Sequence, residues 1–276
     1  MGKKTWYITG ASKGFGLALV KRLLGEGHKV AATSRNKERL QNAVNIITEN
    51  FLPLEVNLRD EASIRASIKQ THETFGNVDV IINNAGYGIF GAVEELSSDE
   101  ILQSVDINLL AAVFVVKHSL PYLRAQHCGH IINISSIGGF AVGTGRAMYS
   151  ASKYAVIGLS EALAQDVKEL NIKVTAIAPG TFRTSFLAGD SLVVAQNKIE
   201  DYKTVHNSEQ RYADMNGKQI GDPELAVKVI MDIAENPEPP AVLFIGSDAY
   251  NRASKKIEEQ RDNLEKYKTI TLSTDF

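Results

Sequence analysis

Short apolar runs alternate with amphipathic segments along almost the whole chain. The apolar runs are rich in β-branched and aromatic residues, which is typical of buried strands. The strands predicted from them are Thr5–Thr9, Lys29–Ser34, Phe51–Val56, Val78–Asn83, His130–Ser135, Ile172–Ala178 and Val242–Ile245. The segments between them space apolar residues at the helical period, and the predicted helices are Leu17–Leu24, Lys37–Val44, Glu61–Phe75, Asp99–Arg124, Met148–Leu170 and Pro223–Ala234.

Strands that are apolar on both faces and alternate with helices indicate a parallel sheet covered on both sides. We therefore predict an α/β fold with one doubly wound parallel sheet, in a single domain over residues 1–276. In such a sheet the ligand crevice lies at the carboxyl ends of the strands. Residues 182–221 are polar and weakly periodic, so we interpret them as a lid over the substrate, and residues 268–276 as a C-terminal tail.

The composition narrows the class of protein. Of 276 residues, 44% are hydrophobic and 22% charged, and the net charge of -2 gives no reason to expect nucleic acid or an anionic membrane as a partner. The longest apolar stretch, Leu109–Val116, is too short to span a bilayer. One cysteine, Cys128, and no cationic leader favour a reducing cytoplasm. His127 and His130 flank Cys128 but read as a turn entering a strand, so we predict no metal site.

A glycine-rich turn joins the first predicted strand to the first predicted helix, with the sequence TGASKGFG over residues 9–16. Glycines permit a tight turn and a close approach of backbone N–H groups to a pyrophosphate, and the helix N-terminus adds partial positive charge. The turn therefore predicts a dinucleotide site. The predicted contacts are Gly10, Ser12, Lys13, Gly14, Phe15 and Gly16.

The second predicted strand ends in Ser34-Arg35, at the position that contacts the adenosine ribose in this kind of site. An acid there would accept a hydrogen bond from the 2′-hydroxyl of NAD, whereas a guanidinium attracts the 2′-phosphate of NADP. Lys13 supplies a second cation on the same side. These residues predict NADP(H) as the cofactor, and the simpler alternative is that Arg35 only solvates the end of a strand.

Tyr149 and Lys153 are four residues apart at the start of a predicted helix, so they share one face. Ser136 ends the fifth predicted strand, where the crevice should lie, and Asn108 is in the preceding helix. A nearby ammonium and an oxidised nicotinamide would lower the pKa of a phenol and suit it to acid/base work. Ser136 can hydrogen-bond the substrate oxygen where charge develops. The four residues predict a catalytic site.

Five motifs, in order and spacing, resemble the single-domain branch of the short-chain dehydrogenase/reductase family over about residues 4–246. They are TGASKGFG at 9–16, NNAG at 83–86, Ser136, the pair Tyr149 and Lys153, and Pro179-Gly180. The resemblance implies a Rossmann-type sheet of seven strands in a homodimer or homotetramer. It also implies hydride transfer between nicotinamide and a carbonyl or alcohol.

By position, the resemblance makes Tyr149 the proton donor or acceptor and has Lys153 bind the nicotinamide ribose and lower the Tyr149 pKa. Ser136 would orient the substrate, and Asn108 would hold a water in a proton relay. The remaining implied cofactor contacts are Asn57, Leu58, Asn84, Ala85, Gly86, Pro179, Gly180 and Thr184. Asn57 departs from the aspartate of many relatives but keeps a hydrogen-bonding amide.

Aromatic and aliphatic residues on the predicted crevice loops suggest an apolar substrate pocket, so we expect a hydrophobic ketone or aldehyde to be reduced. The predicted pocket residues are Phe90, Ser136, Phe140, Val142, Phe182 and Phe186. Two other functions stay open: a regulator that binds NADP(H) without chemistry, and an isomerase or dehydratase of the same superfamily. The first usually lacks the tyrosine or lysine, and the glycine spacing and lack of a large C-terminal domain argue against the second.

Overall fold

The computed structural model describes residues 2–187 and 189–276. Its main sheet has seven strands, all paired in parallel, which confirms the predicted fold class. The strands lie in the order β3 (Phe51–Glu55), β2 (Lys29–Ser34), β1 (Thr5–Ile8), β4 (Val80–Asn83), β6 (Gly129–Ile134), β7 (Ile172–Pro179) and β9 (Val242–Ile245). From β1 to β3 successive strands are added on one side of the sheet, and from β4 to β9 they are added on the other side. Doubly wound sheets form their ligand crevice at this switch between β1 and β4.

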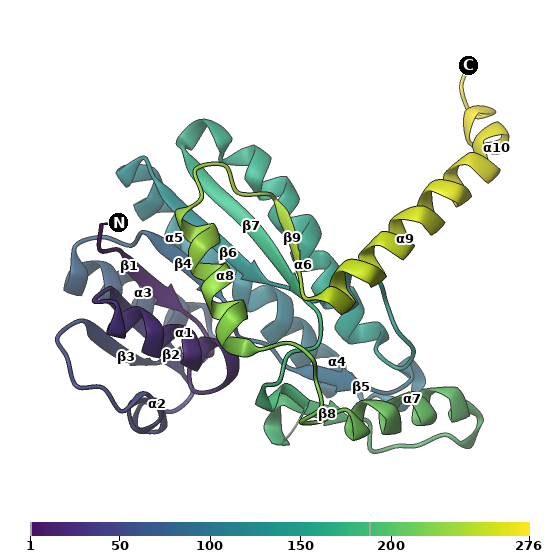
Figure 1. The fold of residues 1–276 in the computed structure, drawn as a ribbon, viewed down its shortest axis with the longest axis horizontal. Helices are drawn as coiled ribbons and strands as arrows, with labels where there is room; N and C mark the ends of the chain where they lie inside the picture. The colour runs from purple at the N-terminus through teal and green to yellow at the C-terminus, as the bar shows by residue number, and fades with distance from the viewer. Residues whose placement is uncertain (1, 188) are drawn as a thin grey trace.

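Helices cover both faces of the sheet (Figure 1). One layer contains α1 (Gly14–Gly25), α2 (Lys37–Val44) and α8 (Pro223–Glu235), and the other contains α3 (Glu61–Phe75), α5 (Ala111–Gln126) and α6 (Ala147–Asp166). Side chains alternate across β1, so that Trp6 and Ile8 pack into the first core and Tyr7 into the second. Because both cores are apolar, the strands are apolar on both faces.

The predicted helix Asp99–Arg124 consists of three consecutive segments: α4 (Ser98–Val105), a π-helical turn (Asp106–Leu110) and α5. The π turn contains Asn108, which is buried. Its side chain accepts from the Tyr87 N–H at 2.9 Å and donates to the Tyr87 carbonyl at 3.0 Å. A π turn widens the helix locally and is frequent at functional sites. Here it carries Asn108, whose side chain spans to the loop after β4.

Two C-terminal helices, α9 (Ser247–Lys266) and α10 (Lys268–Leu272), follow the last strand and project from the body (Figure 1). The hydrophobic pattern does not predict α9, because only Ala249 and Ala253 near its start are buried and most of the rest is polar and exposed. Strong helix formers and i,i+4 pairs such as Lys255 with Glu259 stabilise it locally. Part of the segment predicted as a tail, 268–276, is therefore helical.

Residues 182–221 leave the sheet after β7 and return just before α8. The two ends of this excursion are bridged, since the Arg183 N–H donates to the Gly221 carbonyl at 2.9 Å. Within it lie β8 (Leu192–Val194) and α7 (Lys203–Asp214), and β8 pairs in parallel with β5 (Gly88–Phe90). Short 3-10 turns complete the chain at Val93–Glu95, Ile137–Gly139, Lys168–Leu170, Ser185–Leu187, Gly189–Ser191 and Glu200–Tyr202.

A buried carboxylate anchors this excursion to the body. Glu95 accepts hydrogen bonds from the Ile199 N–H at 2.9 Å and from His206 Nε2 at 2.6 Å. Burial acts to raise the pKa of Glu95. These hydrogen bonds and one from the Ala92 N–H outweigh the effect of burial and lower the pKa to about 2. The anchor therefore keeps its negative charge at any physiological pH.

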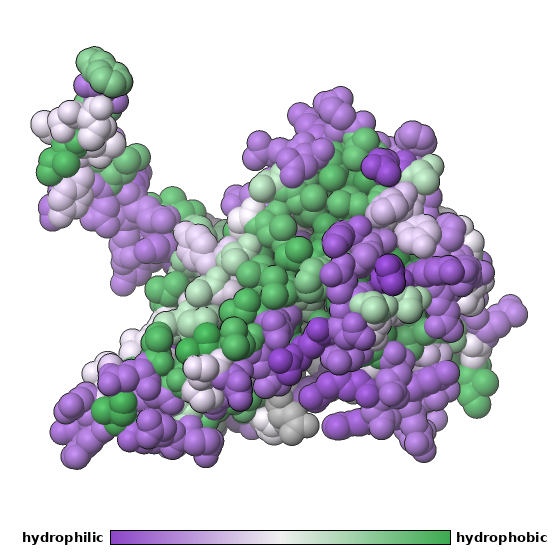
Figure 2. Space-filling model, turned by 180° about the vertical axis from the view of Figure 1, so that it is seen from behind, coloured by the Kyte–Doolittle hydropathy of each residue, from purple (hydrophilic) through white to green (hydrophobic). Residues whose placement is uncertain are grey.

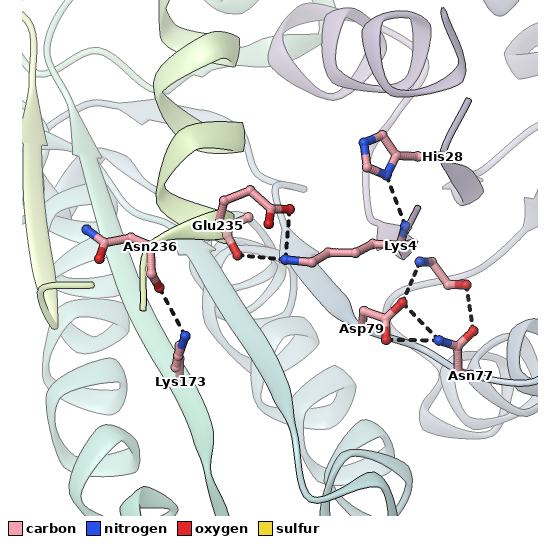
Figure 3. Close-up of polar contacts among 9 residues, drawn as sticks. Lys4, His28, Asn77, Asp79, Lys173, Glu235 and Asn236 are labelled. Atoms are coloured by element: carbon pink, nitrogen blue, oxygen red, sulfur yellow. Dashed lines mark hydrogen bonds and ion pairs between the residues drawn. The ribbon is translucent and has the colours of Figure 1, made fainter. Parts of the chain in front are cut away.

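Polar contacts link α8 and the strands of the sheet at the amino-terminal ends of the strands (Figure 3). Lys4, just before β1, pairs with Glu235 at the end of α8 at 2.7 Å. Lys173, near the start of β7, donates to the Asn236 carbonyl at 3.0 Å. These contacts hold α8 to the sheet at the end of the strands opposite the predicted crevice.

Among residues 2–187 and 189–276, no helix combines the length and hydropathy needed to cross a bilayer. In the same residues no group of three or more His, Cys, Asp or Glu is placed to hold a metal ion. Hydrophobic residues gather over the middle of the face that carries α3, α5 and α6 (Figure 2). Exposed apolar side chains on α4 and α6 include Leu102 and Tyr154.

Candidate active site

A cavity of about 520 Å³ opens along the carboxyl ends of the strands, bordered by the loops after β1, β2, β3, β4, β6 and β7 and by residues 182–221. It lies where a parallel sheet of this order forms its ligand crevice. The predicted cofactor contacts that line it are Gly10, Ser12, Lys13, Gly14, Phe15, Ser34, Arg35, Asn57, Leu58, Asn84, Ala85, Gly86, Tyr149, Lys153, Pro179, Gly180 and Thr184.

The glycine turn is held tightly against the loop after β4. Gly10 has a φ of +66°, and a Cβ added there would lie 2.8 Å from the Ala85 Cα, so both the conformation and the space require glycine. Asn84 donates to the carbonyls of Thr9 and Gly10 at 2.9 and 3.0 Å. Gly16 does not line the cavity, because it packs behind the turn, where a Cβ would lie 2.6 Å from Asn84 Nδ2.

Helix α1 begins at the cavity, which its first residues, Gly14 and Phe15, line. Lys13 occupies the N-cap position with an extended backbone, and its side chain makes no capping hydrogen bond. The first N–H groups of α1 are therefore available to a ligand, and the helix dipole favours a negative one. This arrangement fits the pyrophosphate of a dinucleotide.

Arg35 lies at the end of β2, where it is exposed and lines the cavity. Within the described part of the chain, its guanidinium has no ion pair, whereas Arg59 nearby is bound to Asp106 at 3.0 Å. The Asn57 side-chain oxygen accepts from the Arg59 N–H at 3.1 Å, so it stabilises the turn after β3. Arg35 is thus a cation without a partner at the end of the cavity that is expected to take adenosine.

Tyr149 is 5% exposed, and its phenol lies beside Ser136, two residues after the end of β6. The Ser136 hydroxyl also accepts from the Gly138 N–H at 3.0 Å. Burial raises the pKa of Tyr149, while the Ser136 hydroxyl and the Arg146 guanidinium act to lower it. Arg146 is thus a cation that acts on the phenol in the chain without cofactor, and the effect of Lys153 on the Tyr149 pKa stays a prediction.

Lys153 is buried on α6, and its ammonium donates to the Ile134 carbonyl at 2.9 Å. Burial lowers the pKa of Lys153 to about 8. A Cβ added at Gly86 would lie 3.1 Å from Lys153 Nζ and 3.0 Å from Asn108 Oδ1, so both groups converge beneath this glycine. The structure therefore brings the four predicted catalytic residues to one end of the cavity, with Asn108 behind the lining.

The model of the short chain dehydrogenase family matches residues 4–191. This chain belongs to that family. The oxidoreductase BOA17 of Botryotinia fuckeliana is 36% identical over 98% of this chain and 99% of its own length. The 3-ketodihydrosphingosine reductase of Bacteroides thetaiotaomicron is 39% identical over 71% of this chain and 70% of its own.

Solved structures of short-chain dehydrogenases share the architecture. One from Streptomyces avermitilis has a TM-score of 0.92 and 29% identity, with 100% of both chains covered. ElxO with NADP bound has a TM-score of 0.75 and 26% identity, over 91% of this chain and 100% of that one. As a member of the short-chain dehydrogenase family, this chain is an oxidoreductase that transfers hydride with a nicotinamide cofactor.

Only part of the predicted substrate pocket of this short-chain dehydrogenase lines the cavity. The residues that do are Ser136, Phe182 and Phe186. Phe90 is buried beneath residues 182–221, with its ring 5.5 Å from that of Tyr212. Phe140 packs against Phe244 in a separate cluster, and Val142 faces solvent with 60% of its surface exposed. Sequence distance from Ser136 does not reveal which way each side chain of a loop turns.

Other cavity residues escape the sequence analysis. Arg146 is the N-cap residue of α6, three residues before Tyr149, so its closeness along the chain could have indicated it. Tyr212, Gln219 and Arg252 reach the cavity from distant segments, and no local pattern identifies them. Outside the lining, Asp248 of α9 accepts from the Thr181 N–H and hydroxyl at 2.8 and 2.9 Å and so holds the loop after Pro179-Gly180.

Proposed function

We propose that this short-chain dehydrogenase is an NADP(H)-dependent reductase that converts a ketone or aldehyde with an apolar body to an alcohol. The observation that carries the proposal is the polarity of the cavity along its length. Tyr149, Ser136 and Lys153 meet at one end, and the unpaired Arg35 and the half-buried Lys13 border the other. The name of the Bacteroides relative, a 3-keto reductase, supports the reductive direction.

The proposed chemistry assigns each residue an atom to act on. When bound, the nicotinamide supplies the hydride. The Tyr149 hydroxyl gives a proton to the substrate oxygen, and the Ser136 hydroxyl donates to the same oxygen as negative charge develops there. The Lys153 ammonium binds the ribose, and Asn108, beside it beneath Gly86, holds the water that returns the proton. Thr184 and the loop at Pro179-Gly180 border the space for the carboxamide.

The preference for NADP(H) rests on Arg35 and Lys13. The Arg35→Asp variant should lose most of its affinity for NADPH while its affinity for NADH changes little or rises, because the carboxylate repels the 2′-phosphate. Each lost charge-assisted contact is worth roughly 1.5–3 kcal/mol, or about 10- to 100-fold in affinity. Fluorescence titration with both cofactors measures the ratio.

Arg39→Asp is the matched control. Arg39 lies four residues after Arg35, in α2, where it is exposed and does not line the cavity. It makes the same change in net charge and should leave the cofactor ratio unchanged. Equal affinity of the unmutated protein for NADPH and NADH would refute the assignment.

The apolar part of the substrate is assigned to Phe186, Leu187 and Val193, which border the cavity near the catalytic end. The Phe186 ring lies 6.0 Å from that of Tyr149. In a panel of ketones and aldehydes followed by NADPH consumption, kcat/KM should rise with chain length, by up to ~0.8 kcal/mol for each buried methylene. A best substrate with a short, fully hydroxylated chain would contradict this.

Three further expectations stay predictions. The excursion 182–221 closes the cavity as a lid, which its anchor at Glu95 and its cavity residues support. The apolar face in Figure 2 supports a homodimer or homotetramer, which light scattering would test. The cytoplasmic location rests on the sequence alone. No observation in the described residues favours a non-catalytic regulator, an isomerase or a dehydratase.

A further inference from the structure

Arg146 places an unpaired charge inside the cavity. It is half-buried at the start of α6 and lines the cavity three residues before Tyr149. Its guanidinium stacks on the Tyr212 ring at 4.1 Å, and its Nε and Nη2 are buried without a hydrogen-bond partner. Across residues 2–187 and 189–276, no carboxylate forms an ion pair with it. A buried cation without a counter-ion is costly, so this one calls for an explanation.

Gln219 is a second polar residue of the cavity lining whose buried side-chain atoms have no hydrogen-bond partner among the described residues. It is 2% exposed and lines the same cavity, yet both its side-chain nitrogen and its side-chain oxygen lack a partner. Arg183 donates to the Gln219 backbone carbonyl at 3.1 Å, which holds this residue in place while leaving its side chain unused. Buried polar groups are nearly always hydrogen-bonded, so the carboxamide is prepared for a ligand.

Arg252 of α9 adds a second guanidinium to this part of the cavity wall, where it donates to the Ala141 carbonyl. Burial lowers the pKa of Arg146, the phenols of Tyr212 and Tyr149 act to raise it, and the charge of Arg252 acts to lower it. Among the residues that the structure describes, the titratable groups that act on Arg146 are therefore two phenols and another cation. A negative charge from a ligand would relieve both the desolvation and the repulsion.

We infer that the substrate of the proposed reductase is an oxo acid, whose carboxylate binds Arg146 while its carbonyl meets Tyr149. The inference rests on the proposed function for the position of the carbonyl. A guanidinium matches a planar carboxylate with two parallel hydrogen bonds. Gln219 adds an unpartnered polar side chain to the lining of the same cavity. Arg146 is the N-cap residue of α6, three residues before Tyr149, and both side chains line the cavity. The chain between carboxylate and carbonyl then lies against Phe186.

The experiment compares an oxo acid with its methyl ester, which has the same carbonyl and chain but no charge. In the unmutated protein, kcat/KM for the acid should exceed that for the ester by roughly 10- to 100-fold. The Arg146→Gln variant should bring this ratio close to one, mainly through KM. Arg211→Gln is the matched control, because Arg211 lies next to Tyr212 on α7 but is exposed and outside the lining. It should keep the full ratio.

A binding measurement separates this inference from the proposed function. The saturated carboxylic acid without the carbonyl should bind the unmutated protein, by calorimetry in the presence of NADP, and should bind Arg146→Gln at least about 10-fold more weakly. If that difference is seen but no carbonyl compound is reduced, the anion site stands and the reductase assignment falls. Equal kcat/KM for acid and ester in the unmutated protein, or an equal loss for both in Arg146→Gln, overturns the anion site.

Discussion

The Tyr149→Phe variant should bind NADPH as the unmutated protein does and lose at least 10²–10⁴-fold in turnover. The change removes one oxygen from a side chain that is already packed, so the fold and the cavity should persist. Hydride transfer leaves negative charge on the carbonyl oxygen, and a positioned acid is worth about that factor. Single-turnover oxidation of NADPH with a reducible ketone measures the effect.

Tyr154→Phe is the control for this experiment, since Tyr154 lies on the exposed side of the same helix and outside the cavity. It should keep full activity. A folded Tyr149→Phe variant that binds NADPH and keeps most of its activity would show that the proton comes from another group.

The pH profile adds a separate check on Tyr149. Burial raises its pKa in the chain without cofactor, so the phenol stays protonated and ready for reduction through the neutral range. Oxidation needs the phenolate. Oxidative activity should rise through a pKa below the ordinary value of ~10, because the positive charge of the oxidised cofactor and the nearby ammonium of Lys153 favour the phenolate.

The Lys153→Met variant should lose at least 10²-fold in turnover and also bind cofactor about 10- to 100-fold more weakly, because one ammonium serves both the ribose and the proton path. Burial lowers the pKa of Lys153 to about 8. Cofactor affinity of the unmutated protein should therefore fall as the pH rises through about 8, and the variant should lack this dependence. Titrations from pH 6.5 to pH 9.5, chosen to be about 1.5 pH units either side of that pKa, measure both effects.

The thermal stability of the Lys153→Met variant tests whether Lys153 serves function or holds the fold together. With its pKa lowered on folding, Lys153 binds fewer protons in the folded chain than in the unfolded chain between its folded pKa of about 8 and ~10.5. Its contribution to the free energy of unfolding therefore rises with pH across that window and is lost as the pH falls through about 8. Without cofactor at pH 7, Lys153→Met should be at least as stable as the unmutated protein in thermal melts. A large destabilisation there, with Lys168→Met as the exposed control, would indicate a structural function for Lys153.

Local sequence determined the sheet and most of its helices. Strands such as Lys29–Ser34 and Val78–Asn83 could be read directly, because both faces of the sheet are buried there and the apolar run is nearly continuous. The glycine turn was readable because its backbone requires glycine at Gly10. Tyr149 and Lys153 were readable as a pair because both lie on one helix, where the spacing along the chain sets their relation.

Tertiary structure decided which side chains line the cavity. Phe90 at the end of β5 and Phe140 after the 3-10 turn Ile137–Gly139 lie in segments beside the site, yet their rings pack elsewhere, against Tyr212 and Phe244. Arg146 could be suspected from its place three residues before Tyr149, but only the tertiary structure shows that no carboxylate of the described residues pairs with it. Gln219 and Arg252 come from the 182–221 excursion and from α9. Hydrophobic periodicity reports how a segment meets the core, and it carries no information about which distant segments share a cavity.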